Sequence, residues 1–160
     1  LTAGTGVVVS VLPAKVEGET GVPVYKVVTE GGKTFSLDLV KTDESSKLTI
    51  FKVKASEVSD FAKETEKISL LKLSEKDTIV GQTIIGVGAT SAGSHTVAVS
   101  IVSSISAGSE TVPATLKTNA SNPENLGGPL LDIHGEVVGV SLASGSALTK
   151  NFVKTIIDSI

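Results

Sequence analysis

The sequence predicts an all-β fold, built as a barrel or sandwich and closed by a short C-terminal helix. The chain has 160 residues with 16 glycines and only 3% aromatic residues, so Val, Ile, Leu and Ala must build its core. Val and Ile favour strands because their branched Cβ packs well on a pleated surface. Short apolar runs also alternate with turn-forming residues at intervals of roughly 8–12 residues, which is typical of barrels and sandwiches.

The first half of the chain reads as a series of strands joined by polar turns. Residues 33–39 alternate with period two, the pattern of a strand with one solvated face. Residues 30–33 form a good hairpin turn before that strand. The charged segment 55–67 could hold a helical turn near residues 58–63, but its apolar face is thin, so it is interpreted as a surface connection. Strands are expected at residues 7–9, 11–16, 23–29, 34–40 and 48–53.

The second half continues the pattern and ends in the one clear helix signal. Phe152, Val153, Ile156, Ile157 and Ile160 recur at helical spacing, which predicts an amphipathic helix over residues 150–160. A β-hairpin is expected where His134 and Gly135 join two apolar runs. Strands are expected at residues 68–73, 83–87, 96–105, 112–118, 130–133 and 136–142.

Composition excludes several classes of function. The net charge is −3 and all 14 basic residues are lysine. The chain therefore lacks the bidentate arginine fork and any basic block for nucleic acid. It has no cysteine, hence no disulfide and no thiolate metal site. No apolar run approaches the roughly 20 residues that span a bilayer. The chain begins at Leu1, so we expect any signal or anchor to lie outside it. We expect no cofactor, because the Gly-x-Gly at residues 4–6 lacks a following helix and reads as a turn.

The stretch at residues 119–131 organises the second half of the chain. It is dense in turn formers and runs directly into the expected hairpin. The pair Gly127-Gly128 predicts a backbone that adopts positive φ or that something approaches closely. The run Asn125-Leu126-Gly127-Gly128-Pro129 resembles the nucleophile loop of chymotrypsin-fold serine proteases, Gly-Asn-Ser-Gly-Gly-Pro, with leucine where the serine would stand.

The resemblance extends over nearly the whole chain to the HtrA/Deg-type trypsin-like serine proteases. Six weakly matching stretches occur in the family's order, at residues 4–9, 30–35, 73–88, 96–103, 118–131 and 135–140. The resemblance implies two antiparallel six-stranded β-barrels of the trypsin-like type, with the first at about residues 1–60 and the second at 61–148. A C-terminal helix would follow at 149–160. It also implies a location on the extracytoplasmic or periplasmic side of a bacterial envelope.

The residues at the family's catalytic positions have changed. The chemistry needs a serine activated by a histidine, which a buried aspartate orients. By resemblance, Leu126 occupies the serine position, Lys47 the aspartate position and Lys15 the histidine position. No histidine precedes His95 in the chain. Glu124 replaces the glycine that supports the oxyanion hole, where its carboxylate would repel a developing oxyanion.

Three functions remain open at this level. The first is a catalytically inactive module, or pseudoprotease, that binds a protein or an extended peptide in the former cleft by strand addition. The second is a hydrolase with relocated residues, for which Ser121 and Ser141 are the candidate nucleophiles. The third is a purely structural β domain of a larger envelope protein. If the resemblance holds, the cleft is lined by Glu124, Asn125, Leu126, Val140, Ser141 and Leu142.

The remaining polar residues have a plain structural interpretation. His95 and His134 are far apart in turn-like contexts, whereas a metal site needs three or four ligands, so no metal site is predicted. Asp43 and Glu44 are interpreted as a solvated turn rather than an acid–base pair. The two lysines at triad positions are expected to face water or to pair with acids such as Glu17 or Glu124.

Overall fold

The computed structural model describes residues 7–11, 24–29, 31–66, 71–89, 95–109, 112–119 and 125–160. In this part of the chain the fold is mostly β, as expected. The elements in order are β1 (Val7–Val11), β2 (Tyr25–Val28), β3 (Thr34–Thr42), β4 (Leu48–Val53), α1 (Val58–Thr65), β5 (Thr83–Ala89), β6 (His95–Ser106), β7 (Thr115–Thr118), β8 (Pro129–Leu131), β9 (Val137–Ser141), η2 (Ala143–Gly145), β10 (Ser146–Thr149) and α2 (Lys150–Ile157).

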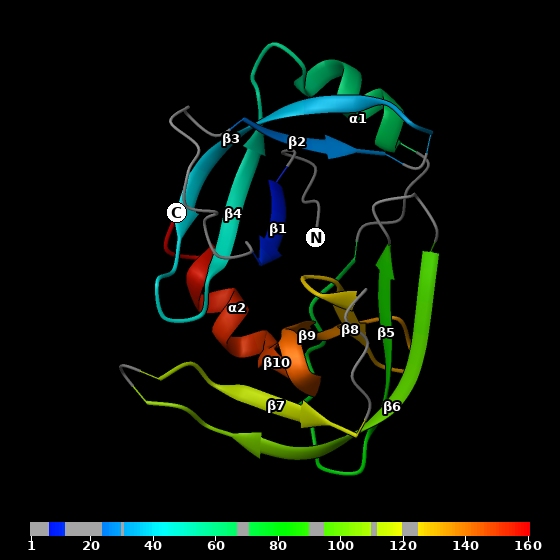
Figure 1. The fold of residues 1–160 in the computed structure, drawn as a ribbon, viewed down its shortest axis with the longest axis vertical. Helices are drawn as coiled ribbons and strands as arrows, with labels where there is room; N and C mark the ends of the chain where they lie inside the picture. Colours follow the sequence, from blue (N-terminus) through cyan, green and yellow to red (C-terminus); the bar gives the residue numbers. More distant parts are fainter. Residues whose placement is uncertain are drawn as a thin grey trace.

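The N-terminal strands form a four-stranded antiparallel sheet in the order β1-β4-β3-β2, in the upper half of Figure 1. Its register pairs Tyr25 with Leu37 and Leu37 with Val53. A bulge between Leu39 and Lys41 bends β3. Two six-stranded barrels were expected, but the described residues of this half form an open sheet and not a closed barrel.

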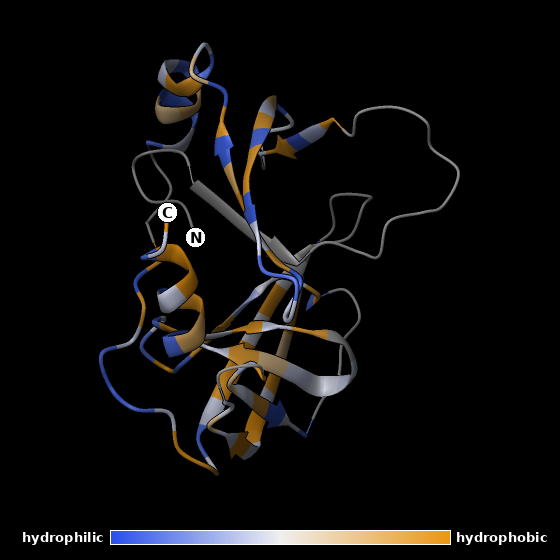
Figure 2. Ribbon diagram, turned by 90° about the vertical axis from the view of Figure 1, so that its left-hand side faces the viewer, coloured by the Kyte–Doolittle hydropathy of each residue, from blue (hydrophilic) through white to orange (hydrophobic). Residues whose placement is uncertain are grey.

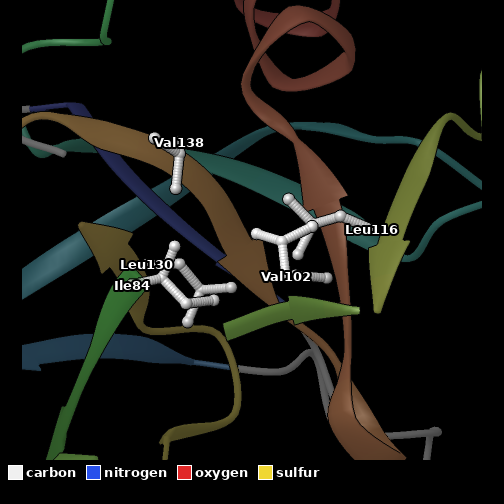
Figure 3. Close-up of a cluster of buried hydrophobic side chains, with 6 residues drawn as sticks. Ile84, Val102, Leu116, Leu130 and Val138 are labelled. Atoms are coloured by element: carbon white, nitrogen blue, oxygen red, sulfur yellow. The ribbon is translucent and has the colours of Figure 1, made fainter. Parts of the chain in front are cut away.

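The C-terminal strands close into a six-stranded barrel in the order β10-β7-β6-β5-β8-β9, in the lower half of Figure 1. One of the expected barrels is therefore confirmed. Inward-facing residues alternate with outward-facing ones along β6. The barrel core consists of Ile84, Val102, Leu116, Leu130, Val138 and Ala147, all at most 5% exposed (Figure 3).

Helix α1 corrects the interpretation of residues 55–67 as a surface connection. The helix is fixed by one aromatic side chain, Phe61, which is buried and meets the ring of Phe35 edge to face at 5.2 Å. The carboxylate of Glu57 also accepts hydrogen bonds from the backbone N–H and the hydroxyl of Ser36. One buried aromatic residue is enough to hold this helix on the sheet, because the sheet supplies Phe35 as its partner. The sequence pattern of residues 55–67 does not show this contact.

Helix α2 confirms the predicted C-terminal helix and lies between sheet and barrel in Figure 1. The hydroxyl of Thr149 accepts the N–H of Phe152 and caps its start. Lys150 is buried and donates to the carbonyls of Ser74, at 2.6 Å, and Lys76. Figure 2 shows apolar residues on the barrel strands and on α2, and also on the strands of the sheet. A shared core joins the two halves, built from Leu48, Ile50, Val140, Leu148 and Val153.

Some strand boundaries differ from the expectation. The strand expected at residues 112–118 is shorter, because β7 begins at Thr115. In the described part of segment 68–73, only Leu73 pairs, through a single parallel bridge to Val137. Residues 12–16, expected to be a strand, lie outside the described residues. No described helix is long and apolar enough to cross a membrane.

Candidate functional site

The loop that precedes β8 lies against β5 and depends on its two glycines for different reasons. Gly127 has φ of +76°, a conformation that favours glycine. At Gly128 a Cβ atom would stand 2.1 Å from the carbonyl oxygen of Val87, so only glycine fits beside β5. The expectation of positive φ or close approach is confirmed, with one glycine serving each purpose.

Hydrogen bonds fasten this loop to the end of β9. The N–H of Gly127 donates to the carbonyl of Ser141 at 2.9 Å, and the N–H of Ser141 donates to the carbonyl of Gly128 at 2.9 Å. A turn bond from the N–H of Gly128 to the carbonyl of Asn125 completes the loop at 2.8 Å. The side chain of Leu126 stands at the tip of this turn, and the residue is 45% exposed.

Asn125 turns inward from the same loop. This residue is only 4% exposed, and its Oδ1 accepts a hydrogen bond from the hydroxyl of Thr96 at 2.7 Å. It packs over Gly86 so closely that a Cβ atom at Gly86 would stand 2.6 Å from Asn125 Nδ2. Asn125 therefore joins the loop to β5 and β6 through contacts that a larger residue at position 86 would prevent.

A small cavity lies beside Asn125 at one end of the barrel core. Its volume is about 20 Å³. That space is enough for about one ordered water molecule. Leu130 belongs both to this lining and to the barrel core in Figure 3. The lining consists of uncharged residues, namely Gly86, Ala98, Ser100, Thr118, Asn125, Leu130, Ser141, Leu142, Gly145 and Ser146.

Lys47 lies in the turn between β3 and β4. It has φ of +60°, and its ammonium group pairs with the Glu44 carboxylate at 2.9 Å, with both side chains mostly exposed. Asp43 organises the turn by accepting hydrogen bonds from the hydroxyls of Ser45 and Ser46 and from the Ser46 N–H. Burial acts to raise the pKa of Asp43, but these hydrogen bonds and the nearby charge of Lys41 together hold that pKa below its usual value.

The shared core links the two strands that adjoin the candidate regions. Leu48, directly after Lys47, belongs to the same buried cluster as Val140, directly before Ser141. Ser141 in turn carries the loop that presents Leu126.

The predicted site residues differ in what they offer to a ligand. Val140 is only 2% exposed, so its side chain supports the site from beneath and offers no surface to a ligand. Ser141 uses both its N–H and its carbonyl within the barrel. Leu126 and Leu142 keep exposed surface. Three residues predicted at or near the site, namely Lys15, Ser121 and Glu124, lie outside the described residues, as does Glu17.

The two histidines do not join this group. His95 is exposed on the outer face of β6, and the alternation of the strand points it away from the side that carries Thr96. His134 lies in the β8–β9 turn before Val137, the first residue of β9, whereas Ser141 is the last. The full length of β9 therefore separates them. Among the described residues, no group of three or more His, Cys, Asp or Glu is placed to hold a metal ion.

Asp132 fixes the turn that holds His134. It is buried, and its Oδ1 accepts the backbone N–H groups of His134 and Glu136 at 2.8 and 3.0 Å. Its Oδ2 accepts the hydroxyl of Ser74 at 3.5 Å. Burial acts to raise the pKa of Asp132, but the two backbone hydrogen bonds, the nearby His134 and the Ser74 hydroxyl together hold that pKa below its usual value.

Sequence reasoning missed part of the cavity lining. Thr96, Ala98 and Ser100 lie at alternate positions of β6 on the face that looks toward the cavity and Asn125. This run of small residues on one face was a usable signal, because a barrel normally fills its interior with larger side chains. No sequence pattern predicts Ser146 in the cavity lining, since only the pairing of β10 with β7 brings it to the cavity.

The fold is that of a trypsin-like peptidase domain, and the chain belongs to that family. The family's sequence model, described as a trypsin-like peptidase domain, matches residues 4–140. A comparison with curated proteins gave no match.

Solved structures of HtrA/Deg-type proteases share the fold. The HtrA-type protease AlgW, solved with a decapeptide, has a TM-score of 0.73 and 17% identity over 99% of this chain and 49% of its own. The serine endoprotease from Yersinia pestis has a TM-score of 0.73 and 18% identity over 99% of this chain and 55% of its own. The MamO protease domain from Magnetospirillum magneticum has a TM-score of 0.66 and 21% identity over 98% of this chain and 83% of its own. The chain spans only about half the length of the first two of these relatives.

Proposed function

We propose that this chain is a catalytically inactive trypsin-like domain that binds a protein or an extended peptide beside the loop at residues 125–128. The observation that carries the proposal is Leu126. The turn that contains Leu126 has the glycine pair and the hydrogen bonds to β9 that expose this position to solvent. The side chain exposed there is aliphatic. Such a side chain cannot attack a carbonyl, but it can contact an apolar ligand.

The neighbouring residues support the loss of chemistry. Lys47, at the expected aspartate position, is a cation paired with Glu44 and cannot orient an imidazolium. Ser141 is the described serine that bonds directly to the loop, but its hydroxyl is directed to the carbonyl of Leu142 at 3.5 Å. Neither described histidine faces it, because His95 points outward and His134 lies at the other end of β9. A relocated hydrolase that uses Ser141 therefore lacks a general base within the described residues.

The surface beside the loop supports peptide binding. Leu126 is 45% exposed and Leu142 is partly exposed, so both offer apolar surface close to Ser141. The backbone of Ser141 is already paired with the loop, and residues 143–145 form the η2 turn, so we place the peptide against the side chains of Leu126 and Leu142 and not in a strand added after β9. The structural relative AlgW was solved with a decapeptide.

Two experiments test the two parts of the proposal. A fluorophosphonate probe and casein turnover, run beside an active trypsin-like peptidase, test for chemistry. We expect neither labelling nor turnover, and labelling that Ser141→Ala abolishes would overturn the claim of inactivity.

A peptide array with fluorescence polarisation of the hits tests for binding. We expect Leu126→Asp to weaken binding at least tenfold, because it places a charge on the contact surface. Ile133→Asp is the matched control, since Ile133 is 70% exposed at the opposite end of the β8–β9 hairpin. An array without hits would favour a purely structural role for the domain.

A further inference from the structure

The barrel carries an exposed apolar surface on the outer side of three neighbouring strands, β6, β5 and β8. We propose that this surface, the outer apolar face, binds the same face of a second copy of this chain and forms a weak two-fold dimer. The face consists of six apolar residues on one side of these strands, namely Ile85, Val87, Val97, Val99, Ile101 and Leu131.

The alternation of each strand separates this face from the barrel core. Along β6, Ser100 and Val102 are buried, so the odd-numbered residues of 97–101 point outward. Ile84 on β5 and Leu130 on β8 belong to the barrel core, so the residues on either side of each point outward as well. The outer apolar face is therefore distinct from the interior that the cavity adjoins.

The strand register joins the outward residues into rows across the strands. Val87 pairs with Val97, and Ile85 pairs with Val99. Leu131 extends the second row, because it pairs with Ile85 from the other side. Side chains directly opposite each other on one face of a sheet lie about 5 Å apart and contact one another. The three strands therefore present one continuous apolar surface.

The centre of this face is open to solvent. Val97 and Val99 are 66% and 68% exposed, and Ile101 is 42% exposed. Helix α2 packs on β9 and β10, whereas β5 and β6 lie on the side of the barrel away from it (Figure 1). A contiguous exposed apolar patch that runs across several strands is typical of an interaction surface.

The chemistry of the face suits a second copy of the same chain. A two-fold interface brings the same patch of both copies together, so any charge on the patch would meet a like charge. None of the six residues is ionisable or polar, so the face is complementary to itself. The net charge of −3 is small, so two copies repel each other only weakly.

Two-fold symmetry also matches the order of residues on β6. With the axis at Val99, Val97 of one copy lies opposite Ile101 of the other, and the two faces interdigitate as packed sheets do. His95 and Ser103 continue the outward row beyond both of its ends and are exposed. They give the apolar centre a polar rim, as protein interfaces usually have.

The size of the face determines the strength of the dimer. Three strands about 4.8 Å apart, each contributing five residues of about 3.3 Å, give a face of roughly 14 by 17 Å. With their rims, two such faces bury roughly 1,000 Å² when they meet, which is the lower limit for a specific interface. We therefore expect a reversible dimer with a dissociation constant of roughly 100 µM.

Sedimentation velocity measures the dimer at protein concentrations from a tenth to ten times this dissociation constant. The sedimentation coefficient of the native chain should rise from the monomer toward the dimer value. Val99→Lys should weaken the dimer at least tenfold, because it buries two like charges at the axis. Val28→Lys is the matched control and should leave the dimer unchanged, since Val28 is 64% exposed at the end of β2 in the other half of the molecule.

Cysteine cross-linking locates the contact, because the native chain has no cysteine. Val99→Cys places one thiol at the proposed axis, and Val28→Cys places one on the sheet as the control. Packed sheets lie about 10 Å apart, which suits a short bis-maleimide better than a direct disulfide. The reagent should link two copies of Val99→Cys efficiently and should leave Val28→Cys as single chains.

Three results would overturn the dimer. If the native chain stays monomeric at the highest concentration, the outer apolar face serves a different partner. If an oligomer persists in Val99→Lys, or if Val28→Cys cross-links as well as Val99→Cys, the copies meet through another surface. Peptide binding at Leu126 is measured on a different surface by a different assay, so either inference can fail alone.

Discussion

The sheet and the barrel solve the same packing problem with different side chains. The sheet holds Tyr25, Phe35 and Phe51, and α1 adds Phe61, whereas no strand of the barrel carries an aromatic residue. A closed six-stranded barrel has a narrow interior that aliphatic side chains fill. The described sheet is open and needs larger rings and a helix to cover its face, as the ring pairs Tyr25–Phe51 and Phe35–Phe61 show.

The difference explains why the candidate site belongs mainly to the barrel. Its loop is fixed from two directions, by β5 under Gly128 and by β9 through Ser141. The equivalent turn of the sheet, around Asp43 and Lys47, is held by local hydrogen bonds and one exposed ion pair. A rigid frame on closed strands holds a binding loop more precisely than a turn at the end of an open sheet.

The largest expected effect contrasts a glycine of the barrel with one of the sheet. A Cβ at Gly128 would meet the Val87 carbonyl, which is backbone and cannot move alone. Gly128→Ala should therefore destabilise the fold by more than about 4 kcal/mol. Gly32, in the β2–β3 turn, has φ of +78° and open space around it. As the control, Gly32→Ala should cost only about 1 kcal/mol. Urea unfolding measures both, and equal costs would show that the barrel end is not rigid.

The next effect distinguishes the shared core from the sheet's own core. Leu48→Ala and Phe61→Ala should each cost about 3 kcal/mol through cavity formation. Leu48 packs with Val140 and Leu148, so its loss should reduce amide protection in β9, β10 and α2 as well as in β4. Phe61→Ala should reduce protection only in α1 and the sheet. Hydrogen exchange measures the pattern, and identical patterns would mean that the two halves unfold as one unit.

The turns of the two regions can be compared through the pH dependence of the stability that one aspartate contributes to each. Asp43 and Asp132 each have a pKa lowered in the folded state. Their stabilising contribution is therefore present above the unfolded pKa of about 3.9 and is lost as the pH falls through the folded pKa. Asp132 is buried and Asp43 is only partly buried.

The buried aspartate should contribute more. Asp132→Asn should cost about 2 kcal/mol at pH 7, because a neutral amide oxygen is a weaker acceptor than a carboxylate. Asp43→Asn should cost about 1 kcal/mol, since water can replace part of what is lost. Both losses should shrink below about pH 4. Urea titrations across this acid range measure them, and a pH-independent loss would exclude ionised acceptors.

The smallest effect compares the helices of the two regions. Lys63 pairs with Asp60 on α1 and Lys154 with Asp158 on α2, and all four side chains are mostly exposed. Lys63→Ala and Lys154→Ala should each change stability by no more than about 0.5 kcal/mol. Thermal unfolding at low and high salt measures this. A larger loss would mean that charges, rather than Phe61 and Val153, hold the helices in place.

The sequence by itself determined the local features of this protein. Period-two alternation at residues 33–39 and the helical spacing from Phe152 onward predicted β3 and α2, because each pattern reflects the contacts of a single element. The glycine pair in the loop was interpretable for the same reason, since positive φ and close approach are backbone requirements. The expectation that Lys47 and Leu126 stand at the family's catalytic positions also came from the order of the motifs alone.

Only the tertiary structure decided the features that depend on distant partners. Helix α1 depends on the ring contact between Phe61 and Phe35 of the sheet. The cavity depends on the closure of the barrel, which brings Ser146 into the same lining as Asn125. The closure of six strands in one half and the open sheet in the described residues of the other depend on pairings between strands far apart in the chain. Contacts of this kind do not appear as a hydrophobic repeat in the sequence of either segment, because each side chain packs against a neighbour that only the folded structure brings close.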